Sequence, residues 1–273
     1  MATPFYERIR SIQRKHNSLL CVGLDTDVSK IPGSLNSRKN SVVEFNRRII
    51  EATQDLVCAY KLNLAFYEAL GAACHAVVLH TLESIPADVL RIGDAKRGDI
   101  GNTAEMCAKA MFERLRFDAI TLHPYMGSDS VEPFLRDEAR GAFILALTSN
   151  AGAKDFQYLP VRGKPLYEHV VARSRKWNTR NNCGLVVGAT RGKHLQRIRE
   201  IEPRMPLLIP GIGAQGGDLR SAVQFGCDAT GEMAIINASR SVIYASSGSD
   251  FADAARAAAL SLRDTMNSLR QRR

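Results

Sequence analysis

The sequence predicts an α/β protein that folds as a closed (β/α)8 TIM barrel with a short extra N-terminal helix. Eight apolar, strand-like runs alternate with helical patterns along the 273 residues, and this number of units fits a closed barrel better than an open sheet. No linker of low-complexity composition divides the chain. We therefore expect residues 1–273 to form a single barrel domain, with a lead-in helix in 1–17 and a basic tail at 270–273.

The first half of the chain contains four of the expected strands. After an amphipathic helix at residues 5–15, apolar runs at 19–24, 56–60, 88–93 and 119–122 predict strands that are covered on both faces. A helix is expected to begin at Ser41, because Val42, Phe45 and Ile49 form one apolar stripe. Further helices are expected at about 66–83 and over 104–115. Alternation of this kind implies parallel strands joined by helical crossovers.

The second half repeats the alternation. Strands are expected at residues 142–147, 184–188, 207–209 and 234–236, and helices at 128–135, 165–177, around 195–198 and at 251–269. A longer polar loop at residues 151–163 separates two of the units. A loop of this length is a candidate lid or binding loop.

The net charge of +9 at pH 7 suits an anionic partner, which could be nucleic acid, a membrane surface or a phosphorylated metabolite. The densest basic run, residues 173–180, is interpreted as the solvated face of a helix, so no nucleic-acid partner is expected. No apolar stretch approaches the roughly 18 residues that a membrane span needs, and the first residues do not resemble a secretory signal. We expect a soluble, cytoplasmic protein that has no membrane partner.

A metal site is not expected. The six cysteines form no C-x-x-C pair, and the six histidines form no H-E-x-x-H motif and keep no ligand spacing with the thiols. The cysteines are interpreted as small buried hydrophobic residues in a reducing compartment.

The charged segment at residues 94–99 follows an apolar run directly. If the strand continues this far, Asp94 and Lys96 leave the same face, and Asp99 falls in the next loop. Lys61 and Asn63 have the same spacing at the end of the preceding strand. Burying a charge costs several kcal/mol unless partners compensate, so such a cluster indicates either a function or a structural network of ion pairs. The segment alone leaves both interpretations open.

A candidate phosphate site follows the last two strands. Residues 210–218 are rich in glycine, which lets a backbone approach an oxyanion closely, and Arg240 follows the next strand. Loops after the seventh and eighth strands are the frequent phosphate position in such barrels. A glycine-rich loop alone would more often be a flexible turn, but its pairing with an arginine favours phosphate.

Five segments together resemble the orotidine 5′-phosphate decarboxylase family, in order from about residue 19 to 245. These are residues 22–25, 61–63, 94–103, 210–218 and 239–241, with D-x-K-x-x-D after K-x-N as the most specific motif. The sequences of residues 94–103 and 123–130 are more similar to those of the family branch that has longer chains.

The resemblance implies four catalytic residues. Lys96 is expected to deliver a proton to C6 of the pyrimidine as carbon dioxide leaves, and Asp94 to lie against the substrate carboxylate. Lys61 would link Asp94 to the ribose. Asp99 would reach across a homodimer interface into the partner's site, so that the active sites are shared.

The resemblance also implies substrate-binding residues. Expected roles are a ribose contact for Asp25, pyrimidine contact for Ser149 and phosphate contacts for Gln215 and Arg240. The remaining expected contacts are Asn63, Pro210 lining the pocket, the backbone at Ser239 where relatives often carry glycine, and Ile100 and Thr103 beside Asp99.

The implied reaction is decarboxylation of orotidine 5′-phosphate to uridine 5′-phosphate and carbon dioxide, the last step of de novo UMP biosynthesis, without a cofactor. One alternative is a magnesium-dependent sugar-phosphate decarboxylase or aldolase on the same barrel, but such relatives carry a metal-binding glutamate where this chain has Lys61. The other is a non-catalytic nucleotide-binding protein, which would not account for Lys61, Asp94 and Lys96.

Overall fold

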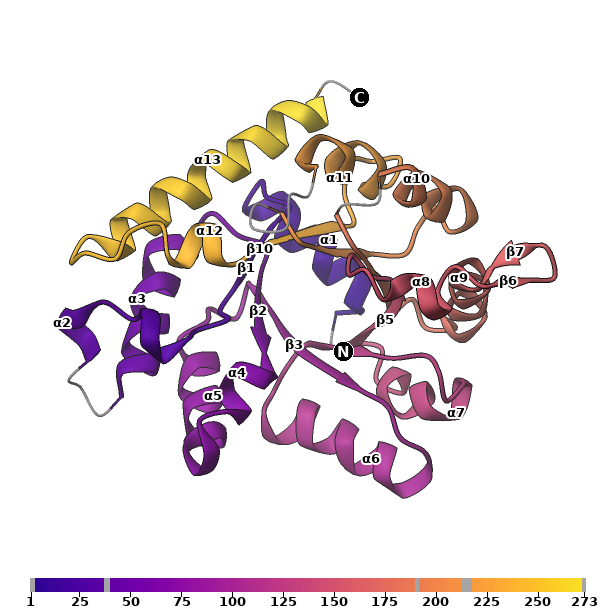
Figure 1. Ribbon diagram of the computed structural model, residues 1–273, viewed down its shortest axis with the longest axis horizontal. Coiled ribbons are helices and arrows are strands. Elements are labelled where there is room, and N and C mark those ends of the chain that lie inside the picture. The colour runs from indigo at the N-terminus through magenta and orange to yellow at the C-terminus, as the bar shows by residue number, and fades with distance from the viewer. Residues whose placement is uncertain (1–2, 37–39, 190–191, 213–217, 272–273) are drawn as a thin grey trace.

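Eight parallel strands close into a barrel in the computed structural model, which describes residues 3–36, 40–189, 192–212 and 218–271 (Figure 1). Their order around the barrel is β1-β10-β9-β8-β5-β4-β3-β2, so the predicted (β/α)8 barrel is confirmed. The barrel strands are β1 (Leu20–Gly23), β2 (Ala59–Asn63), β3 (Leu90–Arg97), β4 (Ala119–Leu122), β5 (Gly141–Leu147), β8 (Cys183–Val187), β9 (Leu207–Pro210) and β10 (Ala234–Ala238).

Helices surround the barrel on its outside (Figure 1). Apolar side chains of the strands and helices form one large core between the two layers, and a second, smaller core fills the barrel interior. The helices are α1 (Phe5–Lys15), α2 (Gly33–Asn36), α3 (Ser41–Thr53), α4 (Leu64–Glu68), α5 (Cys74–Glu83), α6 (Gly101–Lys109), α7 (Ser128–Val131), α8 (Ala153–Phe156), α9 (Leu166–Trp177), α10 (Gly192–Ile201), α11 (Leu219–Gly226), α12 (Arg240–Ile243) and α13 (Phe251–Gln271).

The lead-in helix α1 closes the N-terminal end of the barrel. Its apolar face is buried in the interior core, where the Phe5 ring meets the Phe143 ring edge to face at 6.0 Å. Gln13 donates to the Ala234 carbonyl at 2.7 Å and accepts from the Met233 amide at 2.9 Å, which fixes α1 to the start of β10. With this end closed, the opposite end of the barrel is left for a binding site.

The predicted helix at 66–83 is wrong in detail. The chain forms α4, then a 3-10 turn at Gly71–Ala73, then α5. Gly71 has a φ of +63°, a left-handed conformation that breaks an α-helix and that glycine adopts without a steric penalty. The helical stripe at 104–115 is confirmed as α6, which continues into a π-helical turn at Ala110–Arg114.

Three other regions differ from the expectation. The polar loop at 151–163 contains α8 and a short antiparallel hairpin, β6 (Pro160–Val161) with β7 (Lys164–Pro165). Helix α11, between β9 and β10, was not predicted. Arg270 belongs to α13 rather than to a tail, and residues 272–273 lie outside the described residues. Within the described ranges, no helix has both the length and the hydrophobicity to cross a membrane.

Candidate active site

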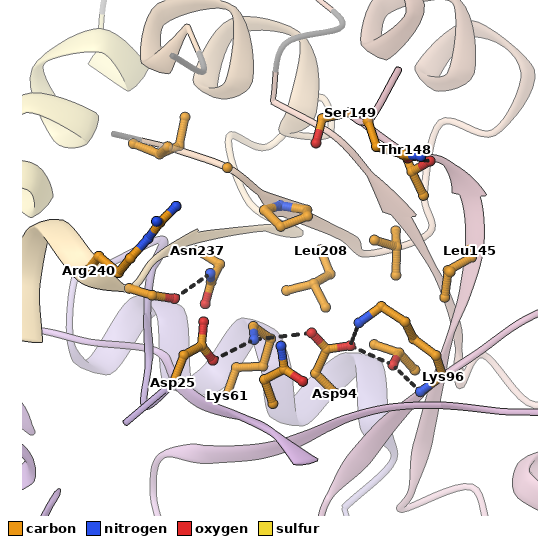
Figure 2. Close-up of a pocket in the computed structure, with 18 residues that line it drawn as sticks. Asp25, Lys61, Asp94, Lys96, Leu145, Thr148, Ser149, Leu208, Asn237 and Arg240 are labelled. Atoms are coloured by element: carbon orange, nitrogen blue, oxygen red, sulfur yellow. Dashed lines mark hydrogen bonds and ion pairs between the residues drawn. The ribbon is translucent and has the colours of Figure 1, made fainter. Parts of the chain in front are cut away.

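A pocket of about 320 Å³ opens at the C-terminal ends of the barrel strands, opposite α1 (Figure 2). A volume of this order suits a small metabolite. The pocket is lined by Asp25, Lys61, Asn63, Asp94, Lys96, Thr121, Leu145, Thr148, Ser149, Asn150, Val186, Leu208, Pro210, Gly211, Ile212, Asn237, Ser239 and Arg240.

Alternating charges line one wall of the pocket (Figure 2). The Lys61 ammonium, on β2, lies 3.3 Å from Asp25 Oδ1 and 3.2 Å from Asp94 Oδ2. The Lys96 ammonium lies 2.6 Å from the other oxygen of Asp94, Oδ1. Asp94 and Lys96 are both on β3, and both side chains face the pocket, as their spacing predicts. We call Asp25, Lys61, Asp94 and Lys96 the charge array.

The inner members of the charge array are held in their ionised forms. Burial alone would raise the pKa of Asp94, but the charges of Lys61 and Lys96, with hydrogen bonds from Lys96 and Thr121, outweigh it and lower the pKa to about 2. Burial alone would lower the pKa of Lys61, which is 3% exposed, but Asp25 and Asp94 raise it above its usual range. Asp94 therefore carries a negative charge and Lys61 a positive charge on this wall of the pocket at neutral pH.

The far end of the pocket carries Arg240, at the start of α12. Figure 2 shows Arg240 and Lys96 at opposite ends, with Leu208 between them. Apolar side chains of Leu145 and Val186 also line the pocket. The arrangement fits an elongated anion with a flat apolar middle.

The pocket brings together most of the residues predicted from the sequence. All four members of the charge array line it, and so do Asn63, Ser149, Pro210, Ser239 and Arg240. Asn63 also caps α4, because its side-chain oxygen accepts from the Ala65 amide at 3.3 Å. The predicted phosphate ligand Gln215 lies outside the described residues.

Three predicted residues do not line the pocket of their own chain. Asp99 accepts a hydrogen bond from the neighbouring Ile100 amide at 2.8 Å, Ile100 is 51% exposed, and Thr103 is exposed on α6. His123, another polar residue that follows a strand, packs against Gly98 instead, where an added Cβ would lie 2.1 Å from its Nε2.

Sequence reasoning missed several residues of the pocket. The apolar lining of Leu145, Val186 and Leu208 carries no chemical signal, because alternate residues of any barrel strand point inward. Thr121 and Asn237 are buried polar residues of β4 and β10, and their polarity within apolar runs could have singled them out. In the part of the chain that the structure describes, no three His, Cys, Asp or Glu side chains are grouped so as to hold a metal ion.

Comparisons with known proteins agree with this geometry. Residues 18–257 match the model of the orotidine 5′-phosphate decarboxylase / HUMPS family. The chain is 48% identical to an orotidine 5′-phosphate decarboxylase of Dehalococcoides mccartyi over 98% of this chain and 99% of the relative, and 49% identical to one of Herpetosiphon aurantiacus over 92% and 94%.

Solved structures show the same fold. The structure of Leishmania donovani OMP decarboxylase superposes with a TM-score of 0.85 at 37% identity, and the match covers 98% of this chain and 99% of that one. The chain belongs to the orotidine 5′-phosphate decarboxylase / HUMPS family.

Proposed function

We propose that this chain decarboxylates orotidine 5′-phosphate to uridine 5′-phosphate and carbon dioxide, with Lys96 as the proton donor. The observation that carries the proposal is the charge array along one wall of the pocket, with Lys96 at one end of the pocket and Arg240 at the other (Figure 2). This arrangement can hold the reacting carboxylate and the phosphate of one nucleotide at the same time. The reaction is the last step of de novo UMP biosynthesis, for which we propose a cytoplasmic location.

Lys96 supplies both charge and a proton. The bond between C6 and the carboxylate carbon breaks, carbon dioxide leaves, and the electron pair stays on C6, which takes a proton from the Lys96 ammonium. Because a delocalised carboxylate gives way to a localised carbanion, the ammonium stabilises the transition state more than the bound substrate. Solvent then restores the proton on Lys96.

Asp94 and Lys61 keep this ammonium in place. The 2.6 Å contact with Asp94 fixes the Lys96 side chain, which is about half exposed and would otherwise move freely. Lys61 offsets the charge of Asp94 from the other side and joins it to Asp25, the proposed ribose ligand. Because these charges are oriented before substrate arrives, little reorganisation is needed during the reaction.

The phosphate binds at the other end of the pocket. Arg240 can form a bidentate, charge-assisted pair with phosphate oxygens, and the backbone at Ser239 lies beside it. We propose Gln215 as a third ligand, Pro210 as an apolar contact, and Ser149 as the contact to the pyrimidine, with Asn63 near the ribose. Binding energy from the phosphate is then available to hold the pyrimidine against the charge array.

We further propose a homodimer in which Asp99 completes the partner's active site. Exposed apolar side chains near Asp99 support an interface here: Ile100 is 51% exposed, and Met106, on the same helix as Thr103, is 59% exposed. In a dimer, Ile100 and Thr103 would enter the partner's site with Asp99. No nucleic-acid or membrane partner is proposed.

The activity is tested with orotidine 5′-phosphate in buffer that contains EDTA. We expect orotate absorbance to fall as uridine 5′-phosphate forms. Turnover that EDTA abolishes would favour the magnesium-dependent sugar-phosphate alternative, and binding without turnover would favour a non-catalytic nucleotide-binding protein.

The shared site is tested by mixing two inactive variants, Asp99→Ala and Lys96→Ala. In a mixed dimer, one of the two sites receives an intact Lys96 from one chain and an intact Asp99 from the other. We expect activity to recover on mixing, and its absence in dimers shown to exchange subunits would contradict the shared site.

A further inference from the structure

The end of β3 departs from regular pairing with β4 where the charge array begins. Gly93 pairs with Ile120 and Arg97 pairs with Leu122, so the segment from Asp94 to Lys96 lies opposite the single residue Thr121. This is a bulge, an irregularity that re-aims side chains and is frequent beside active sites.

Thr121 fills the space opposite the bulge with one hydroxyl group. The hydroxyl donates to Asp94 Oδ1 at 2.9 Å and accepts from the Lys96 backbone amide at 3.0 Å. Thr121 is 1% exposed, so water does not compete for these bonds. A hydroxyl has a single hydrogen to donate, and here Asp94 receives it.

Lys96 needs such support because its backbone is strained. Its φ of +47° lies in the left-handed region, which a non-glycine residue adopts only at an energetic cost that other contacts must offset. The next residues are also attached to β4, since the His123 amide donates to the Arg97 carbonyl at 3.1 Å and the His123 ring packs on Gly98. The end of β4 thus holds the Lys96 backbone from both sides.

Thr121 also sets the orientation of the Asp94 carboxylate. Oδ1 accepts from the hydroxyl and from the Lys96 ammonium, while Oδ2 faces Lys61. One side chain therefore fixes the backbone of Lys96 and the carboxylate that its ammonium contacts.

We infer that Thr121 is a positioning residue for the decarboxylation, acting through Asp94 and Lys96 without touching the reacting atoms. This inference rests on the proposed function. The Thr121 hydroxyl, rather than the volume of its side chain, keeps the Lys96 ammonium beside C6 of the pyrimidine, where the carbanion forms.

The test replaces Thr121 by valine, which has nearly the same shape and no hydroxyl, and by serine, which keeps the hydroxyl. We expect Thr121→Val to lower kcat by about 100-fold, the scale of a misplaced catalytic group. KM for orotidine 5′-phosphate and the affinity for uridine 5′-phosphate should change little, because the phosphate binds at the other end. Thr121→Ser should retain most of the wild-type kcat.

Thr53→Val is the matched control. Thr53 is fully buried on α3, and its hydroxyl bonds to the Ile49 carbonyl at 2.7 Å and to the Tyr60 hydroxyl at 2.6 Å, away from the pocket. Losing these bonds should lower the melting temperature and leave kcat unchanged.

Three results would overturn the inference: a Thr121→Val enzyme with wild-type kcat, a Thr121→Ser enzyme as impaired as the valine variant, or the same loss of kcat in Thr53→Val. If Thr121→Val fails to fold, Thr121→Cys replaces it, since a thiol is a weak donor of similar size and should also lower kcat. A wild-type chain that does not decarboxylate the substrate would refute the proposed function, whereas wild-type turnover with an unaffected Thr121→Val refutes only the role of Thr121.

Discussion

Two aspartates at opposite ends of the barrel, the half-buried Asp94 and the buried Asp118, have matching surroundings. Asp94, at the C-terminal end, accepts from two lysines and from one neutral donor, the Thr121 hydroxyl. Asp118, directly before β4 at the N-terminal end, accepts from two arginines and from one neutral donor, a backbone amide. Its contacts are Arg8 Nη1 at 2.7 Å, Arg140 Nη1 at 3.0 Å and the Arg91 amide at 2.9 Å.

The difference between the two clusters lies in the cation and in what it faces. Arginine does not give up a proton in proteins, and its fork of donors suits fixed pairing. Arg140 uses the same nitrogen to donate to the Phe117 carbonyl at 2.9 Å. Arg8 belongs to α1, so its ion pair fastens this helix to the barrel. The cluster of Asp118 with Arg8, Arg140 and the Arg91 amide therefore stabilises the fold.

Lys96 differs in both respects. Its side chain is 51% exposed and faces the pocket, and an ammonium can transfer a proton to a neighbouring carbanion. A cluster of opposed charges at a strand end therefore does not by itself mark catalysis. A cation that can lose a proton and that reaches a cavity is what separates the two ends.

The largest expected effect comes from removing one cation at each end. We expect Lys96→Ala to lower kcat by at least about 10⁴-fold, because it removes the proposed general acid and, with it, the charge proposed to stabilise the carbanion. Arg8→Ala should leave kcat unchanged, because its cation lies at the closed end. The measurement is the loss of orotate absorbance, with circular dichroism to establish that both variants fold. Equal losses in the two variants would erase the functional distinction between the ends.

The next effect concerns stability at the closed end. Asp118→Ala removes the carboxylate that two arginines share and leaves the Arg91 amide without its acceptor, and we expect it to lower the free energy of unfolding by about 3 kcal/mol. Asp118→Asn should cost less, because its side-chain oxygen can still accept from the Arg91 amide. Both would be measured by urea unfolding, and kcat of the folded variants should match the wild type. A large loss of kcat in folded Asp118→Asn would mean that the two ends are coupled.

The sequence was sufficient to predict the barrel, because its strands are continuous apolar runs and its charged residues follow them directly. The sequence wrongly predicted one continuous helix at 66–83, where the left-handed Gly71 interrupts the helix. The pattern of residues around a glycine does not reveal its φ, so this break could not be foreseen. Helix α11 was missed because the glycine-rich loop before it was considered only as a phosphate site.

Only the charged residues of the site could be predicted from their pattern in the sequence. Lys61, Asp94 and Lys96 were found from their spacing at strand ends, and the structure places all three at the pocket. Thr121 was missed because the role inferred for it depends on the bulge opposite it, and the bulge arises from tertiary pairing that the sequence does not display. Asp118 was missed as a counterpart of Asp94, because its arginines come from distant parts of the chain.

The smallest expected effect is a pH dependence of stability that belongs to Asp94. Its pKa is about 2 in the folded protein and about 3.9 in an unfolded chain, so the lowered value contributes roughly 2 kcal/mol of stability above pH 4, which is lost as the pH falls through 2. Asp94→Asn should therefore be less stable than the wild type at pH 6, and the difference should shrink towards pH 2. Urea unfolding at several pH values measures it, with the exposed Asp253→Asn on α13 as the control for losing one negative charge. A difference that stays constant with pH would mean that the charge array does not hold Asp94 ionised, and the electrostatic account of the open end would then fail.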